Sequence, residues 1–147
     1  MATSRRAEAS WSGDLISGNG TVTAGTTRVF SDLPTTWKAR TEEADGVTSP
    51  EELLAAAHAS CFSMAISNNL AKAGTPPTRI SVSVEITADK TDGGWTVQKA
   101  HITVRGAVPG ATQASFQEAA EGAKDGCPIS KALKGNVELA VEASLET

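Results

Sequence analysis

The segment SPEELLAAAHASCFSM, residues 49–64, decides the fold predicted for this chain. Ser49 is a good helix cap, Pro50 suits the first helical position, and Glu52 stands where a capping box places a carboxylate. The following residues are rich in Ala and Leu until a glycine and two prolines interrupt them. These signals predict one long helix over residues 50–73.

One stripe of this helix repeats at helical spacing and is mostly apolar, so we expect it to face the core. Cys61 lies on this stripe in the middle of the helix. The stripe consists of Leu54, Ala57, Cys61, Met64 and Asn68.

Strands are predicted on both sides of the long helix, from alternation and turn residues. Short strands precede it at 7–11, 20–24, 27–30 and 36–40; a hairpin follows at 80–88 and 95–104, with its turn at 91–94 and a bulge near Lys99–Ala100. A second helix over 112–124, a short turn at 128–134 and a last strand over 137–145 complete the chain. This order predicts an α+β fold, with antiparallel sheets around a long central helix and a single domain over residues 1–147.

Composition narrows the class of protein. The chain has 147 residues, 39% of them hydrophobic and 20% charged, with a net charge of −4. These values are typical of a soluble globular protein and exclude a nucleic-acid partner or a membrane span. No secretory signal is apparent, so we expect a cytoplasmic location, where two cysteines are free, metal-bound or redox-active.

The chemistry depends on the two cysteines, because a thiol becomes a good nucleophile as the thiolate. Cys127 precedes Pro128 at the predicted start of a short helix, where backbone N–H groups favour negative charge. Cys61 lies about 16 Å along its helix, so a side chain must activate it, and Arg40 is the candidate cation.

Each of these residues also has a purely structural interpretation. A lone cysteine in an Ala-rich helix is usually core filler, Arg40 a solvated arginine, and Glu51 a first-turn carboxylate. His58 and His101 have no metal-ligand spacing to the cysteines and are interpreted as satisfied structural histidines. Neither a metal nor a cofactor is predicted.

Two motifs together favour the chemical interpretation. Residues 49–64 and the segment GCPISKAL, residues 126–133, resemble the OsmC/Ohr family of hydroperoxide-reducing proteins, and the likeness extends over essentially the whole chain. Ala57-His58-Ala59 before the cysteine, and Arg40 shortly before the helix, resemble the OsmC branch more closely. Ser49 departs from the Asn that is frequent there, but both residues are good caps.

The resemblance implies a cysteine-based peroxidase of the peroxiredoxin type, without a cofactor. Cys61 is then the peroxidatic thiolate, Arg40 lowers its pKa and holds the peroxide, Glu51 orients Arg40, and Cys127 is the resolving thiol that forms a disulfide with Cys61. The implied partners are an organic hydroperoxide, with hydrogen peroxide a weaker substrate, and a dithiol reductant such as a lipoylated protein.

Helix geometry adds an expectation about assembly. Glu51 and Cys61 are ten residues apart on one predicted helix, which is about 15 Å along its axis and on different faces. We therefore expect the charged groups to reach the thiol across the interface of a homodimer, and the resemblance implies an intertwined one. Small apolar residues around Cys61 would then form a hydrophobic pocket suited to alkyl hydroperoxides.

Two other classes of function stay open. A module that binds a hydrophobic ligand with redox-silent cysteines would have thiols that titrate near about 8.5. A stress-related interaction or structural protein would form no disulfide between Cys61 and Cys127 when peroxide is added.

Overall fold

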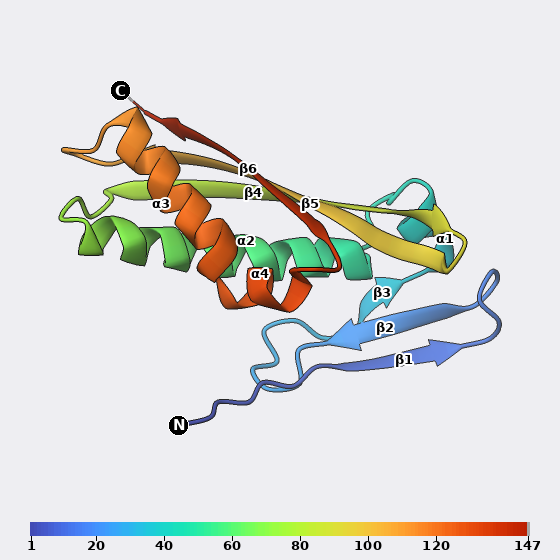
Figure 1. Ribbon diagram of the computed structural model, residues 1–147. Coiled ribbons are helices and arrows are strands. Elements are labelled where there is room, and N and C mark those ends of the chain that lie inside the picture. The colour runs from blue at the N-terminus through green and yellow to red at the C-terminus, as the bar shows by residue number, and fades with distance from the viewer. Residues whose placement is uncertain (147) are drawn as a thin grey trace. The chain divides into compact units, whose positions relative to one another are not determined.

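The structure, a computed structural model, describes residues 1–146. The chain forms two compact units, one of residues 1–53 and one from residue 54 onward. The long helix α2, Pro50–Lys72, begins in the first unit and continues into the second (Figure 1). It confirms the helix predicted from the capping residues to within one residue.

The first unit contains a small antiparallel sheet in the order β1-β2-β3, followed by the short helix α1. Its strands are β1 (Glu8–Ser12), β2 (Asn19–Thr23) and β3 (Leu33–Thr35), and α1 spans Trp37–Thr41. The strands predicted at 7–11 and 20–24 are confirmed. Strand β3 was missed because it is only three residues long and contains Pro34, which fits an edge strand and weakens the strand signal.

Two predicted strands of the first unit are wrong. Thr27–Phe30 lies in a turn, in which Arg28 has a left-handed φ of 59° and donates its backbone N–H to Ala24. Thr36–Arg40 instead forms the start of α1, because the Thr36 side chain caps the helix by accepting the N–H of Ala39 at 3.0 Å. β-branched threonines favoured a strand on propensity, and this cap outweighs it.

The second unit packs helices against a three-stranded sheet in the order β4-β5-β6 (Figure 1). Strands β4 (Arg79–Thr91) and β5 (Gly94–Ala107) form the predicted hairpin. The bulge falls at Gln98, one residue before the expected place. Helix α3 (Gln113–Gly126), helix α4 (Pro128–Leu133) and strand β6 (Glu138–Leu145) follow.

Strand β6 corrects the expectation of purely antiparallel sheets. It pairs with β5 in parallel, from Lys99 opposite Glu138 to Gly106 opposite Leu145. Helices α3 and α4 form the long crossover that a parallel pair requires. The α+β class is confirmed, with one antiparallel and one mixed sheet.

The buried stripe of α2 is not the predicted one. His58, Phe62, Ile66 and Leu70 face the core at a spacing of four residues, whereas Met64 is 69% exposed. The prediction chose the wrong face because alanine can be either buried or exposed on a helix. In an Ala-rich helix the composition therefore gives only a weak signal for the buried face. The core joins α2, β5 and α3 through Phe62, Ile66, Leu70, Ile102, Val104, Val108, Phe116, Ala120 and Ala123.

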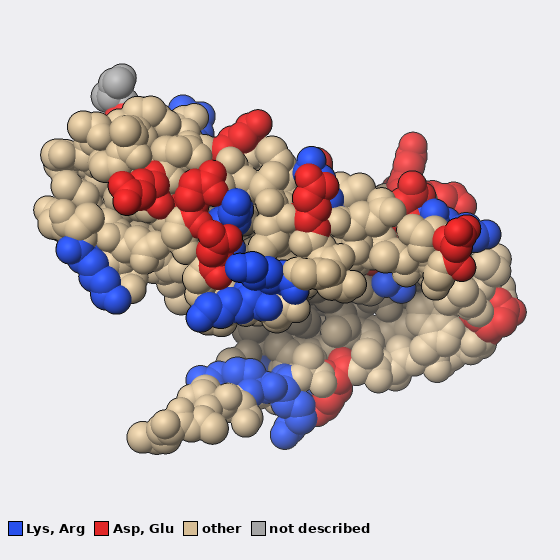
Figure 2. All heavy atoms as spheres, viewed as in Figure 1, with Lys and Arg blue, Asp and Glu red and all other residues tan. Residues whose placement is uncertain are grey.

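Surface features add two observations. Within residues 1–146 no helix is long and apolar enough to cross a membrane. On the face shown in Figure 2, acidic and basic side chains are intermixed over the second unit, so this face offers no continuous basic surface.

Gly106 on β5 lies directly against the core ring of Phe116. A Cβ at residue 106 would lie 2.6 Å from Cε1 and 2.7 Å from Cζ of Phe116. We expect Gly106→Ala to lower the free energy of unfolding by about 1–3 kcal/mol, because the ring must move within a packed core. Urea denaturation measures this, with Gly93→Ala in the open hairpin turn as the control, expected within about 0.5 kcal/mol of wild type. Equal losses in the two variants would contradict the packing argument.

Candidate functional site

The two cysteines meet inside the second unit. Cys61 on α2 and Cys127 between α3 and α4 have their sulfur atoms 3.0 Å apart, and both are free thiols. Cys127 is completely buried, whereas Cys61 is partly exposed. A covalent disulfide of about 2.05 Å is thus reached by a further approach of about 1 Å.

Cys127 occupies two helix ends at once. Its backbone N–H donates to the carbonyl of Ala123 at the end of α3, at 3.0 Å. Its side chain is the N-cap of α4, where the backbone N–H of Ser130 donates to the sulfur at 3.5 Å. Pro128 takes the first helical position, as the sequence predicted. A negative charge on this sulfur is therefore favoured by the N-terminus of the helix.

The pKa values of the two thiols move in opposite directions. Burial foremost, and the neighbouring Cys127 second, raise the pKa of Cys61. Burial also acts to raise the pKa of Cys127, but hydrogen bonds from Cys61 and from the backbone and side chain of Ser130 outweigh it, so the net direction is downward. Within the second unit the thiolate form is therefore favoured more at Cys127 than at Cys61.

A groove of about 410 Å³ opens beside Cys61. Met64, Ala65 and Pro128 give it apolar walls, and Asn68 and Asn69 add amide groups. Cys127 does not line this groove. A small molecule that enters from solvent can thus meet the Cys61 sulfur first.

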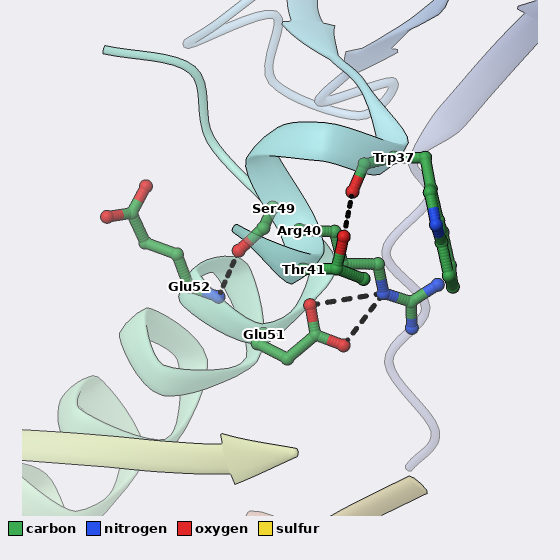
Figure 3. Close-up of polar contacts among 6 residues, drawn as sticks. All are labelled: Trp37, Arg40, Thr41, Ser49, Glu51 and Glu52. Carbon is green, nitrogen blue, oxygen red and sulfur yellow. Dashed lines mark hydrogen bonds and ion pairs between the residues drawn. The ribbon is translucent and has the colours of Figure 1, made fainter. Parts of the chain in front are cut away.

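Arg40 and Glu51 form an ion pair in the first unit. The Arg40 Nε–H donates to both carboxylate oxygens of Glu51, at 2.9 and 3.2 Å. Because both bonds end on Nε, the two terminal NH₂ groups of the guanidinium point away from Glu51 (Figure 3). The guanidinium carbon also lies 5.8 Å from the ring centroid of Trp37, which is a cation–π distance.

The first turn of α2 fixes Glu51. The Ser49 hydroxyl accepts the backbone N–H of Glu52 at 3.1 Å, which confirms the predicted cap (Figure 3). The Glu52 carboxylate accepts from the Thr48 hydroxyl at 2.6 Å. The Glu51 side chain is largely shielded from solvent, with an exposed fraction of 11% against 32% for Arg40.

An apolar pocket of about 340 Å³ adjoins Arg40 within the first unit. Most of its wall is aromatic or aliphatic, and Arg40 supplies a charged group. Its lining includes Trp11, Leu15, Val22, Trp37, Arg40 and Leu53.

The two histidines have different surroundings. His58 is fully buried, and its Nε2 lies 2.8 Å from the Ser130 Oγ, while its Nδ1 has no hydrogen-bond partner within residues 1–146. The interpretation as a satisfied histidine therefore holds for one ring nitrogen and is wrong for the other. His101 lies 3.6 Å from Glu142 on the neighbouring strand β6. Within residues 1–146 no group of three His, Cys, Asp or Glu side chains is placed to hold a metal ion.

The structure thus brings the predicted residues together as two pairs, Cys61 with Cys127 and Arg40 with Glu51. Sequence reasoning missed the contact of His58 with Ser130, which are 72 residues apart. The available signal was that His58 lies in one motif and Ser130 in the other.

Comparison with known proteins gives consistent results. The sequence profile of the OsmC-like protein family matches residues 42–142. Peroxiredoxin OsmC of Escherichia coli K12 is 39% identical over 139 residues, which is 95% of this chain and 96% of that protein. Organic hydroperoxide resistance protein OhrA of Bacillus subtilis is 28% identical over 111 residues, 71% of this chain and 73% of that protein.

Solved structures show the same fold. An organic hydroperoxide resistance protein from Elizabethkingia anophelis superposes with a TM-score of 0.75 at 23% identity, covering 99% of this chain and 100% of that one. OhrB of Bacillus subtilis superposes with a TM-score of 0.72 at 24% identity, covering 95% and 98%.

Burial lowers the pKa of His58, so the folded protein keeps this ring neutral below the ordinary value of about 6.5. The unfolded chain binds a proton there and the folded chain does not, so stability is lost as the pH falls below about 6.5. We expect the free energy of unfolding of wild type to fall from about pH 7.5 to pH 5.5 by more than that of His58→Gln, the difference being limited to about 1.4 kcal/mol per pH unit. Urea denaturation at both pH values decides, and parallel losses in the two proteins would contradict a neutral His58.

Proposed function

We propose that this chain, which belongs to the OsmC-like protein family, is a thiol-dependent peroxidase that reduces organic hydroperoxides through Cys61 and Cys127. The observation that carries the proposal is the pair of free sulfur atoms 3.0 Å apart, one reachable from a groove and one fully buried. The relatives named as a peroxiredoxin and as an organic hydroperoxide resistance protein support this chemistry.

The solvent accessibility of the two cysteines indicates which of them reacts first. Cys61 lines the groove and is partly exposed, so it is the thiol that meets the peroxide. Cys127 is fully buried against it and acts as the resolving thiol. The Cys61 thiolate attacks one oxygen of ROOH, the O–O bond breaks, and the alkoxide takes a proton to leave as ROH. Cys61 is left as a sulfenic acid, which condenses with Cys127 to a disulfide and water.

Activation of Cys61 needs a cation, because its surroundings in the second unit raise its pKa. We assign this role to Arg40, whose terminal NH₂ groups point away from Glu51 and can donate to a thiolate or to a peroxide oxygen. Glu51 holds the guanidinium through Nε. An opposite charge close to the thiol would favour the thiolate and lower its pKa.

We propose that Arg40 acts on Cys61 of a second copy in a homodimer. Glu51 precedes Cys61 by ten residues on the continuous helix α2, about 15 Å along the axis. Met64, which is 69% exposed in the single chain and lines the groove beside Cys61, supplies an apolar side chain for such an interface. In such a dimer, the two units of each chain would act together as a single domain.

The substrate class follows from the groove. Met64, Ala65 and Pro128 favour an alkyl hydroperoxide over hydrogen peroxide, since only the former buries apolar surface there. A dithiol, such as a lipoylated protein, completes the cycle by reducing the disulfide. A cytoplasmic location fits a protein whose two cysteines are free thiols.

Single-turnover oxidation tests the roles of the cysteines. We expect stoichiometric cumene hydroperoxide to convert wild type to the Cys61–Cys127 disulfide, Cys61→Ser to be inert, and Cys127→Ser to stop at a sulfenic acid or beyond. Mass spectrometry of the thiols follows each step. Survival of both thiols in the wild type would end the proposal.

Co-expression tests the placement of Arg40 across the dimer. We expect Arg40→Ala to lose at least about tenfold in activity, because a hydrogen-bonded charge near the thiolate is lost, and Cys61→Ser to be inactive, because it lacks the attacking thiol. In a mixed dimer of the two variants, purified through two different tags, one complete site is restored and about half of the wild-type activity per dimer returns. Arg40 acting within its own chain predicts no recovery.

A hydrophobic-ligand binding module is the second candidate, because the pocket beside Arg40 is lined by Trp11, Leu15, Val22, Trp37 and Leu53. It predicts that a fatty acid binds equally well to wild type and to Cys61→Ser while peroxide leaves both thiols intact. The single-turnover experiment separates the two candidates.

A further inference from the structure

Three fully buried polar side chains, His58, Cys127 and Ser130, form one connected group beside Cys61. His58 Nε2 lies 2.8 Å from the Ser130 Oγ, and the Ser130 backbone N–H donates to the Cys127 sulfur at 3.5 Å. Burying polar groups is costly unless they are hydrogen-bonded, and His58 still leaves Nδ1 without a partner within residues 1–146. The peroxidase chemistry described above does not use this histidine.

The tautomer of His58 follows from this arrangement. The neutral ring carries one N–H. A proton on Nδ1 would be a buried donor without an acceptor. Such a donor is rarer and more costly in proteins than a buried acceptor that lacks a donor. The proton therefore lies on Nε2, which donates to the Ser130 Oγ. The hydroxyl proton of Ser130 is then directed away from His58, on the residue whose backbone N–H donates to the Cys127 sulfur at 3.5 Å.

We propose that His58 and Ser130 form a positioning relay for the resolving cysteine: the His58 N–H holds the Ser130 oxygen so that the Ser130 hydroxyl donates to the sulfur of Cys127. The inference rests on the proposed function, in which Cys127 attacks oxidised Cys61. Ser130 contacts the reacting sulfur directly, and His58 acts through Ser130.

The relay acts on the second covalent step. The Cys127 thiolate attacks the sulfur of the Cys61 sulfenic acid, the S–S bond forms, the S–O bond breaks, and the departing hydroxide takes up a proton to become water. The proton that Cys127 lost on ionising balances this water. A donor on Cys127 favours its thiolate and thus the attack near neutral pH.

Several other groups also contact Cys127, and some of them favour its thiolate. From α2 it faces the thiol of Cys61 and, through Ser130, the ring of His58. The Ala123 carbonyl on α3 accepts the backbone N–H of Cys127, and the backbone N–H groups of Ile129 and Ser130 on α4 favour a negative charge on its sulfur. The charged side chains nearby in sequence are Lys124, which pairs with Glu121 at 2.9 Å, and the exposed Asp125 and Lys131.

Thiolate absorbance in a Cys61→Ala background tests the relay without any peroxide. We expect Ser130→Ala to raise the titration midpoint of Cys127 by about one pH unit, the effect of losing one hydrogen bond to a charged group. His58→Leu should shift it in the same direction, and His58→Gln, whose amide keeps an N–H, should restore part of the shift. Ser63→Ala removes a hydroxyl from α2 that donates to Ser60, and it is the control with no expected shift.

Single-turnover kinetics in the Cys61-containing protein gives the second reading. Ser130→Ala should slow disulfide formation relative to sulfenic acid formation by roughly tenfold near neutral pH. The pH at which the rate of disulfide formation is half-maximal should rise by about one unit. Unchanged midpoints in Ser130→Ala and His58→Leu, with thermal melting that shows both are folded, would overturn the relay. If Cys61 of wild type is not oxidised, the peroxidase proposal fails, and the Cys127 titration still decides whether the relay exists.

Discussion

The buried row on α2, from His58 through Phe62 and Ile66 to Leu70, is the constraint on which the second unit depends. It packs into the same core as β5 and α3 and so sets the rotation of the helix about its axis. Cys61 immediately precedes Phe62 and lies at the border of the buried row, which makes it partly exposed. A rotation of the helix by one residue, about 100°, would bury the thiol in the core or expose it entirely.

The arrangement also divides the chemistry between two units that differ in character. The second unit places the two sulfur atoms 3.0 Å apart, but its burial of Cys61 raises the pKa of the thiol that is proposed to react first. The first unit supplies a guanidinium held by a shielded carboxylate and bordered by aromatic rings. In the proposed mechanism, the reactivity of Cys61 depends on bringing this guanidinium close to its thiol.

Much of this could be predicted from the sequence, because the strongest signals were local. The cap at Ser49, the Asp-Gly turn of the hairpin and the Cys-Pro start of α4 depend on neighbouring residues and were confirmed. The errors arose where tertiary packing decides. Ala residues left the buried face of α2 ambiguous, and the parallel pairing of β6 depends on where the crossover of α3 and α4 returns the chain.

In the candidate site, too, the residue types could be predicted from the sequence but a long-range contact could not. The residue types and motifs indicated Cys61, Cys127, Arg40 and Glu51, and the structure places them as two contacting pairs. The contact of His58 with Ser130 joins residues 72 positions apart, and a spacing of that size carries no geometric information in a single sequence.

Cys127 is a helix cap as well as a reactant, and this double use has a mechanical consequence. In the proposed cycle, disulfide formation turns a charged cap into a neutral, bonded sulfur, which weakens the acceptor for the first turn of α4. A helix of six residues has little stability of its own to offset such a loss. In this cycle α4 is therefore less ordered in the disulfide form than in the dithiol form. The order of one short helix thus changes with the oxidation state of the protein.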